Sequence, residues 1–189
     1  MTSHTALSQI HGAPSVARWL KRYYAGRALF SAVWVAGAFT IGRANPAIGM
    51  ALLIAYPAWD CIANCVDAAR SGGLRANPSQ FLNAVASAIV TLAIAVTAGH
   101  DLHIAIGVIG IWAALAGVLQ LATGIRRWRS ASAQWPQILS GAQSALAGTH
   151  FLFKAFDPAL AVGVADVAPY AAFGALYFAI SSAVLAFRR

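Results

Sequence analysis

The sequence contains no glutamate and few charged residues of any kind. Only 10% of its 189 residues are charged, and its 5 acidic residues are all aspartates. Typical soluble domains carry about 25% charged residues. Hydrophobic residues make up 60% of the chain. This composition excludes an ordinary soluble domain and predicts an all-α integral membrane protein.

Cysteines and catalytic motifs are also scarce. The two cysteines, Cys61 and Cys65, lie four residues apart in an apolar stretch. Successive turns of one helix do not readily give disulfide geometry, and two ligands are too few for a zinc site. The chain has no Gly-rich phosphate loop, no His-Glu-x-x-His and no Gly-x-Ser-x-Gly motif. We therefore predict packing cysteines, no catalytic residues and no cofactor.

Apolar runs long enough for membrane helices follow one another along the chain. The small, polar residues 1–14 predict a disordered tail. Residues 15–25 predict a basic amphipathic helix that lies either on the lipid surface or on the ends of the bundle. The remaining residues, 26–189, form the predicted membrane domain. Its six predicted spans are 28–42, 47–69, 79–98, 102–125, 135–156 and 159–187.

Basic residues gather on one side of these spans. The net charge of +8 would suggest nucleic acid in a soluble protein, but these side chains flank apolar runs, so we predict no nucleic-acid partner. Only Arg43 and Lys154 lie on the opposite side. Because cytoplasmic loops carry an excess of Lys and Arg, both termini are predicted to be cytoplasmic. The residues on the cytoplasmic side are Arg18, Lys21, Arg22, Arg27, Arg70, Arg75, Arg126, Arg127, Arg129, Arg188 and Arg189.

The chain shows signs of a threefold repeat of helical hairpins, over about 27–70, 79–127 and 135–189. Ser31, Ser87 and Ser144 occupy matching places in the first helix of each hairpin. In the second helices Tyr56 matches Trp112, and a looser match continues into the third hairpin. Such a repeat predicts pseudo-symmetry about an axis along the membrane normal. The alternative is that Ala- and Gly-rich hairpins resemble one another by composition.

The second predicted span carries a polar face. Asp60, Asn64 and Asp67 follow one another at i, i+4 and i+7 and so share one side of a helix. Ionisable groups at membrane depth are costly and face the bundle interior or water. A carboxyl group there would suit a proton relay or an acid sensor. The structural alternative is a hydrogen bond from Asp60 to a neighbouring span. The candidates are Asn83, Ser87 and Gln120.

Other polar side chains offer similar alternatives. For Asp67 the structural interpretation is an ion pair with Arg27, which begins the first span at the same depth. Ser140 and Ser144 share a face of the fifth span with Gln137. Such faces either join helices through hydrogen bonds and close contact or line a wet cavity.

Three residues near the non-cytoplasmic ends of spans four to six form a weaker candidate site. Asp166, His103 and His150 could approach one another there. Histidine titrates in the range that an acid sensor needs. A metal site of two histidines and one aspartate is conceivable, but the spacing does not enforce it. Unrelated interfacial histidines are the favoured interpretation.

Three segments of the chain resemble the HdeD-like family of bacterial membrane proteins. They are Gly110-Ile111-Trp112-Ala113-Ala114-Leu115-Ala116-Gly117-Val118-Leu119-Gln120-Leu121, Arg126-Arg127 and Trp135-Pro136-Gln137-Ile138-Leu139-Ser140-Gly141. The resemblance covers spans three to five and rests on packing motifs. It implies a bacterial inner-membrane protein of about six helices linked to acid or stress resistance. It carries over no catalytic residues, and Asp60 and Asp67 match no pattern of the family.

Three function hypotheses follow. The first is an HdeD-like stress protein without catalysis, whose partners are the lipid bilayer, other membrane proteins or further copies of itself. The second is a small transporter or proton-linked channel that uses the face of Asp60, Asn64 and Asp67. The third is a membrane enzyme acting on a lipid or quinone, which is disfavoured because no set of acid, base and nucleophile converges.

Overall fold

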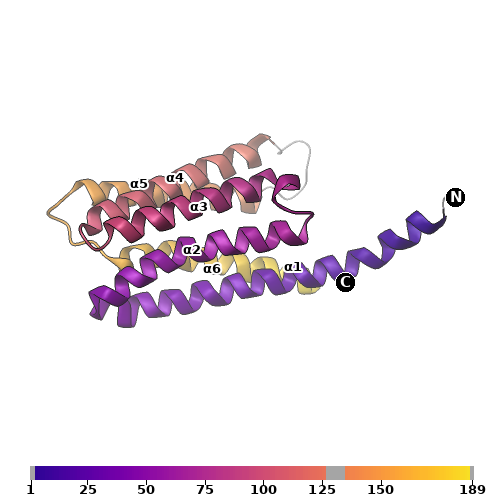
Figure 1. The fold of residues 1–189 in the computed structure, drawn as a ribbon, viewed down its shortest axis with the longest axis horizontal. Coiled ribbons are helices and arrows are strands. Elements are labelled where there is room, and N and C mark those ends of the chain that lie inside the picture. The colour runs from indigo at the N-terminus through magenta and orange to yellow at the C-terminus, as the bar shows by residue number, and fades with distance from the viewer. Residues whose placement is uncertain (1–2, 127–134, 188–189) are drawn as a thin grey trace. The chain divides into compact units, whose positions relative to one another are not determined.

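Helices account for nearly all of residues 3–126 and 135–187, the part of the chain that the computed structural model describes (Figure 1). No strand occurs in that part, which confirms the all-α prediction. Side chains are described for residues 18–122, 125 and 138–187. The elements are α1 (Ser3–Gly37), the π-helical turn η1 (Ala38–Gly42), α2 (Pro46–Arg70), the 3₁₀ turn η2 (Leu74–Ala76), α3 (Pro78–Thr97), α4 (Leu102–Arg126), α5 (Trp135–Phe156) and α6 (Val164–Phe187).

Five segments in the described part are long and apolar enough to cross a membrane, by length and composition. Helix α5 is not among them, because its sequence includes Gln143, His150 and Lys154. A sixth span at α5 therefore stays a prediction. The five segments are Arg18–Gly42, Pro46–Arg70, Pro78–Thr97, Leu102–Ala122 and Val164–Phe187.

Polar turns define the helix boundaries that the sequence predicted. The Asn45 side chain caps α2 by accepting hydrogen bonds from the backbone N–H of Ala47 at 3.0 Å and of Ile48 at 3.2 Å. Pro46 follows at the first helical position, where its missing N–H costs nothing. After α2 the chain turns through Gly72 and Gly73, whose φ angles of 96° and 91° favour glycine.

Two boundaries differ from the prediction. Helix α1 begins at Ser3 and continues without a break into the first apolar run, where we predicted a disordered tail over 1–14 and a separate helix over 15–25. Ala, Leu and Gln in this region are good helix formers, and extending an existing helix is far easier than nucleating one. Helix α6 begins at Val164 instead of 159, because Asp157 caps a turn by accepting from the N–H of Ala159.

The chain divides into two compact units. Unit 1 comprises residues 1–33 and 171–189, and unit 2 comprises residues 34–170. In unit 1, α1 and α6 run antiparallel. Tyr24 stacks on Phe178 with ring centroids 6.1 Å apart, and the Ser182 hydroxyl donates to the Lys21 carbonyl at 3.0 Å. In unit 1 the part of α1 around Lys21 and Tyr24 therefore lies beside the last turns of α6.

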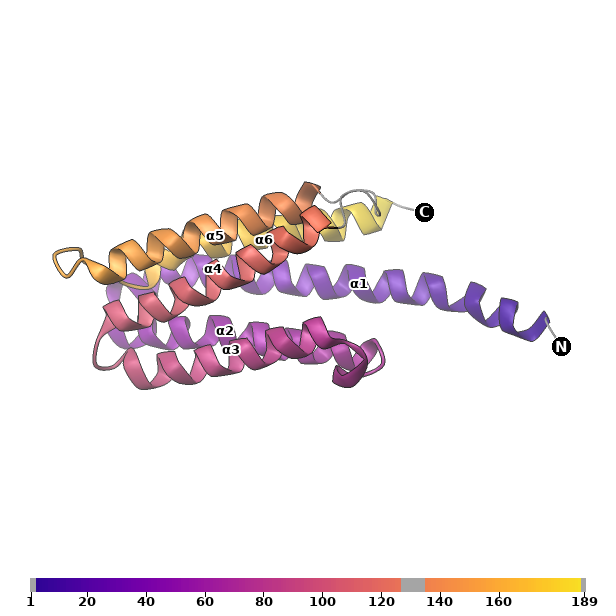
Figure 2. The ribbon, with the colours of Figure 1, turned by 90° about the horizontal axis from the view of Figure 1, so that it is seen from above.

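Unit 2 contains α2 to α5. In Figure 2, α2 runs beside α3 and α4 runs beside α5, in agreement with the helix contacts of this unit. The most extensive contact joins α4 and α5. The residue pairs Gly110–Gly148 and Gly117–Gly141 face each other across it, as an antiparallel arrangement requires. These glycines let the two backbones touch, which is how small residues promote helix association in membranes.

Candidate functional site

The Asp60 carboxylate is the centre of a polar cluster between α2 and α3. Its Oδ2 accepts a hydrogen bond from the Ser87 hydroxyl at 2.8 Å and another from the Asn64 amide at 3.0 Å. The Asn64 amide also donates to the Asp60 backbone carbonyl at 2.8 Å. Ser87 is fully buried, Asn64 is 7% exposed and Asp60 is half-buried. Of the three partners that the sequence offered to Asp60, the structure brings Ser87 to it.

This cluster lies near the middle of its helices. Asp60 precedes Arg70, the last residue of α2, by roughly 15 Å of helix, and Ser87 follows Pro78, the first residue of α3, by roughly 14 Å. The hydrocarbon core of a bilayer is about 30 Å thick. If α2 and α3 cross a membrane, Asp60 and Ser87 therefore meet close to its midplane.

Asp67 lies two turns further along α2 and has its own partner on α3. The Gln80 side-chain amide donates to Asp67 Oδ2 at 3.1 Å, and both side chains are half-buried. The sequence did not suggest this contact, although Gln80 is a polar residue in the first turn of the next helix. The predicted pair between Arg27 and Asp67 would join the two units and stays a prediction.

The Arg27 side chain has a distinct environment within unit 1. Its guanidinium carbon lies 4.2 Å from the ring centroid of Phe178, and its Nη1 donates to the Tyr23 hydroxyl at 3.3 Å. A guanidinium over an aromatic face gains cation–π attraction that grows as water is removed. This contact lets a half-buried arginine lie among aromatic side chains.

The remaining polar candidates are spread over separate places. Asn83 is exposed, although it lies on α3 one turn before Ser87, while Gln120 and Ser140 are half-buried. Ser144 is buried, and its hydroxyl donates to the Ala113 carbonyl of α4 at 2.9 Å. It also lies 3.3 Å from the Tyr170 hydroxyl. Ser144 thus joins helices, as the packing interpretation of its face requires.

An aromatic cluster fills unit 2 beside the polar contacts. Tyr56 meets Trp112 and Tyr170 edge to face, with ring centroids 6.4 and 6.3 Å apart. Trp34 lies 4.9 Å from Tyr56, and its indole N–H donates to the Leu52 carbonyl at 2.7 Å. Edge-to-face aromatic pairs add stability beyond their buried area. This cluster links helix α2 to α4 and to the first turns of α6.

Asp166 is committed to an ion pair and a helix cap. Lys154 near the end of α5 pairs with Asp166 in the first turn of α6, and both side chains are about one-fifth exposed. The other carboxylate oxygen of Asp166 accepts from the Gly163 N–H at 2.7 Å, which caps α6. The sequence analysis missed this pair. The sequence contained a signal for this pair. Apart from Asp157 in the turn itself, Lys154 and Asp166 are the only Lys, Arg, Asp or Glu residues within ten residues of the Asp157-Pro158 turn.

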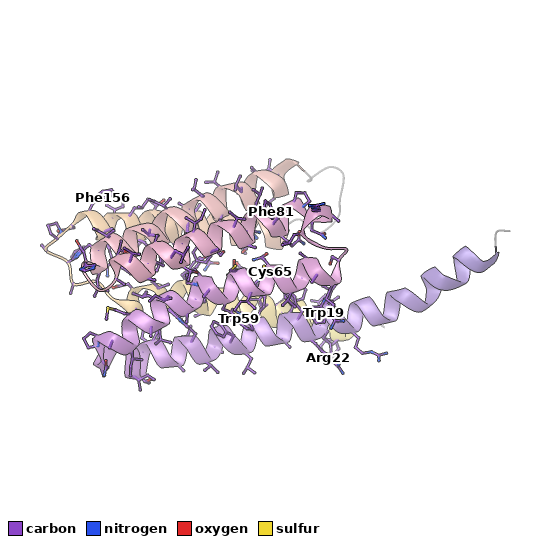
Figure 3. All side chains as sticks on the ribbon, viewed as in Figure 1. Trp19, Arg22, Trp59, Cys65, Phe81 and Phe156 are labelled. Atoms are coloured by element: carbon purple, nitrogen blue, oxygen red, sulfur yellow. The ribbon has the colours of Figure 1, made fainter. Side chains whose placement is uncertain are left out.

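The two histidines considered with Asp166 make contacts with other residues. His103 Nε2 is 3.0 Å from the Leu160 carbonyl, and its Nδ1 is 3.6 Å from Asp101. His150 is exposed and contacts the Phe151 ring. Among the described residues no three His, Cys, Asp or Glu side chains gather as a metal site would need. Cys61 and Cys65 are free, half-buried thiols on α2, where Figure 3 labels Cys65.

Removing the charge of Lys154 tests the ion pair. We expect Lys154→Met to lower the free energy of unfolding by about 1 kcal/mol, because partly exposed pairs are weakened by solvent. Asp166→Asn should cost a similar amount while keeping an acceptor for Gly163. Unfolding in mixed detergent micelles, measured for both single variants and the double variant, gives the coupling energy. Additive losses would contradict the pairing.

The chemistry available in these clusters is hydrogen bonding and ion pairing between helices. Searches against protein-family models, curated proteins and solved structures found no match to this chain.

Proposed function

We propose that this chain is a multi-pass protein of the bacterial inner membrane that acts in acid or stress resistance without catalysis, as its resemblance to the HdeD-like family implies. The proposal includes six spans, with α5 as the fifth, arranged as three hairpins, and it includes cytoplasmic termini. Its partners are the lipid bilayer, other membrane proteins and further copies of the chain. The observation that carries the proposal is the way the Asp60 carboxylate is held.

Two hydrogen bonds, one from Asn64 of α2 and one from Ser87 of α3, end on the Oδ2 atom of Asp60. One donor belongs to α2 itself and the other to α3, so together they fix the position of the carboxylate between the two helices. Such an arrangement favours a permanent structural link between α2 and α3. Ser144 and Gln80 make further links of the same kind, so the polar residues support a bundle held together by side-chain hydrogen bonds.

Burial supports the threefold repeat. Ser31, Ser87 and Ser144, which the repeat places at equivalent positions, are 2%, 0% and 7% exposed. Together with Asn64 they are the buried polar residues of the described part of the chain. A serine that recurs in a buried place in each hairpin is what a repeated two-helix unit would produce. Composition alone would not select these positions.

The contacts between α1 and α6 in unit 1 support the proposal that both termini lie on the same side of the membrane. The contacts of Lys21 with Ser182 and of Tyr24 with Phe178 bring the beginning of α1's apolar run to the level of the end of α6. An even number of spans has the same consequence. The excess of basic residues on this side then favours the cytoplasm.

Acid survival tests the proposed function. Cells lacking the protein should lose viability after acid shock, and expression of the wild-type chain should restore it. The Asp60→Asn variant should restore survival equally, because its amide oxygen can still accept the hydrogen bond of the Ser87 hydroxyl. Equal survival with and without the protein would overturn the proposal.

A proton-linked transporter or channel is the second candidate, and the observation that favours it is a half-buried carboxyl at the middle of α2. It predicts that purified protein in liposomes carries protons, measured with a pH-sensitive dye inside the vesicles, and that Asp60→Asn abolishes this flux. Our leading proposal predicts flux no greater than that of empty liposomes. Flux that depends on Asp60 would replace the leading proposal with the second.

A further inference from the structure

The exposed side of α1 changes from basic to apolar within three turns. Arg18, Lys21 and Arg22 have exposed side chains that share an arc of about 100° around the helix. The same side continues with Leu29 and Val33, which are 67% and 64% exposed. In a membrane helix such a change marks the passage from the headgroup region to the acyl chains, where long basic side chains reach back to the phosphates.

Aromatic side chains lie at the same level of α1 as these basic residues. Trp19 and Tyr23 have ring centroids 5.8 Å apart, and Tyr24 follows at 5.5 Å from Tyr23. Tryptophan and tyrosine are enriched at membrane–water interfaces. Figure 3 shows Trp19 and Arg22 together on this part of α1. The basic and aromatic residues therefore agree on where the interface crosses the helix.

A hydrogen bond also fixes the position of the turn of α1 that carries Arg18, Lys21 and Arg22, the basic turn. The backbone carbonyl of Lys21 accepts the Ser182 hydroxyl of α6 at 3.0 Å, so this turn is tied to the second helix of unit 1. Unit 1 contains no acidic residue, since the first aspartate in the sequence is Asp60 and the last is Asp166. Its exposed cations thus have no aspartate or glutamate side chain of their own unit to neutralise them.

We propose that Arg18, Lys21 and Arg22 bind the phosphate headgroups of anionic phospholipids, such as phosphatidylglycerol, in the membrane that the protein spans. The argument is charge complementarity at a place where the helix enters the bilayer. Each basic residue near an anionic membrane surface contributes roughly a fivefold preference. The sequence predicted a separate helix that lies either on the lipid surface or on the ends of the bundle, whereas Arg18, Lys21 and Arg22 belong to the continuous helix α1.

This inference rests on the proposed membrane insertion and deepens it. Native mass spectrometry of the detergent-solubilised full chain, titrated with phosphatidylglycerol or phosphatidylcholine of the same acyl length, measures the preference directly. The test variant is Lys21→Gln/Arg22→Gln. The matched control is Arg43→Gln/Arg75→Gln, which removes two exposed arginines from other places. Extraction of cell membranes with alkaline carbonate shows whether each variant remains integral.

We expect the wild-type chain and the control to prefer phosphatidylglycerol, and the Lys21→Gln/Arg22→Gln variant to lose about 25-fold of that preference. An unchanged preference in that variant would overturn the inference. Displacement of the lipid by millimolar inorganic phosphate would also overturn it, because the site would then take a free anion. A chain that carbonate extracts would instead overturn the proposed membrane insertion itself.

Discussion

A single methyl group added at Gly117 should lower the free energy of unfolding by about 2 kcal/mol, and the same change at Gly148 should do likewise. A Cβ atom at Gly117 would run into the backbone N and Cα of Ala145 and the carbonyl of Gly141. A Cβ at Gly148 would meet the backbone of Ala114 and Gly110 in the same way. Backbone atoms cannot rotate aside, so α4 and α5 must separate.

The double variant Gly117→Ala/Gly148→Ala should lose more than either single variant but less than the sum of the two losses, because both changes force the same separation of α4 from α5. Gly26→Ala is the matched control. It is also a helical glycine, but an added Cβ there has no atom within 4 Å. Alanine has the higher helix propensity, so this variant should gain up to about 1 kcal/mol.

Reversible unfolding in mixed micelles, followed by far-UV circular dichroism, gives the free energy of unfolding of each variant. The opposite signs expected at Gly117 and Gly26 separate a packing effect from the general effect of replacing glycine in a helix. Gly107→Ala provides an intermediate case, since its Cβ would lie 3.2 Å from the Ala155 methyl group, which is tight but not a backbone clash. Stabilisation at Gly117 would refute the close α4–α5 contact.

The helices themselves followed from the sequence because hydropathy and turn chemistry are local. Asn45-Pro46 ends one apolar run and caps the next, and the observed α2 begins at Pro46. The start of α1 did not follow, because a helix can extend backwards over residues that have no strong pattern of their own. Five segments are confirmed to be long and apolar enough to cross a membrane, whereas α5 has enough polar residues to leave its span a prediction.

The sequence predicted only the part of the candidate site that lies on one face of one helix. Asp60 and Asn64 share that face by spacing alone, and the structure adds a hydrogen bond between their side chains. Partners on other helices depend on how the helices rotate and slide, which no single segment encodes. Ser87 was one of three candidates for Asp60, and Asn83 is exposed although it lies one turn away on the same helix. The pairing of Lys154 with Asp166 was missed, although these two opposite charges flank one short turn of the sequence.

Removing the acceptor at Asp60 should produce the other large effect. Asp60→Ala removes the oxygen that accepts the hydrogen bond of the Ser87 hydroxyl and one of the two hydrogen bonds of the Asn64 amide. Ser87 is fully buried, so its hydroxyl is left without an acceptor from Asp60. An unsatisfied buried polar group costs about 1–3 kcal/mol, and hydrogen bonds to charged groups lie at the upper end. We therefore expect Asp60→Ala to lose about 3 kcal/mol of unfolding free energy.

Asp60→Asn should lose less, about 1 kcal/mol, because its amide oxygen still accepts from Ser87. A double-mutant cycle isolates the contact between the two helices. Ser87→Ala alone should cost about 1–2 kcal/mol, and in the Asp60→Ala background it should cost little, because the acceptor has already gone. The control is Ser181→Ala, whose hydroxyl donates to the Tyr177 carbonyl of its own helix and should be nearly neutral in either background.

The cycle also bears on function, because a structural link and a proton pathway place opposite demands on Asp60. A link that holds α2 against α3 must be paired all the time, so its loss appears as lost stability and as a coupling energy with Ser87. A group in a proton pathway must change partners during each cycle, so its replacement would abolish flux with little change in stability. A coupling energy near zero, with stability unchanged in Asp60→Ala, would therefore remove the observation on which the proposed function rests.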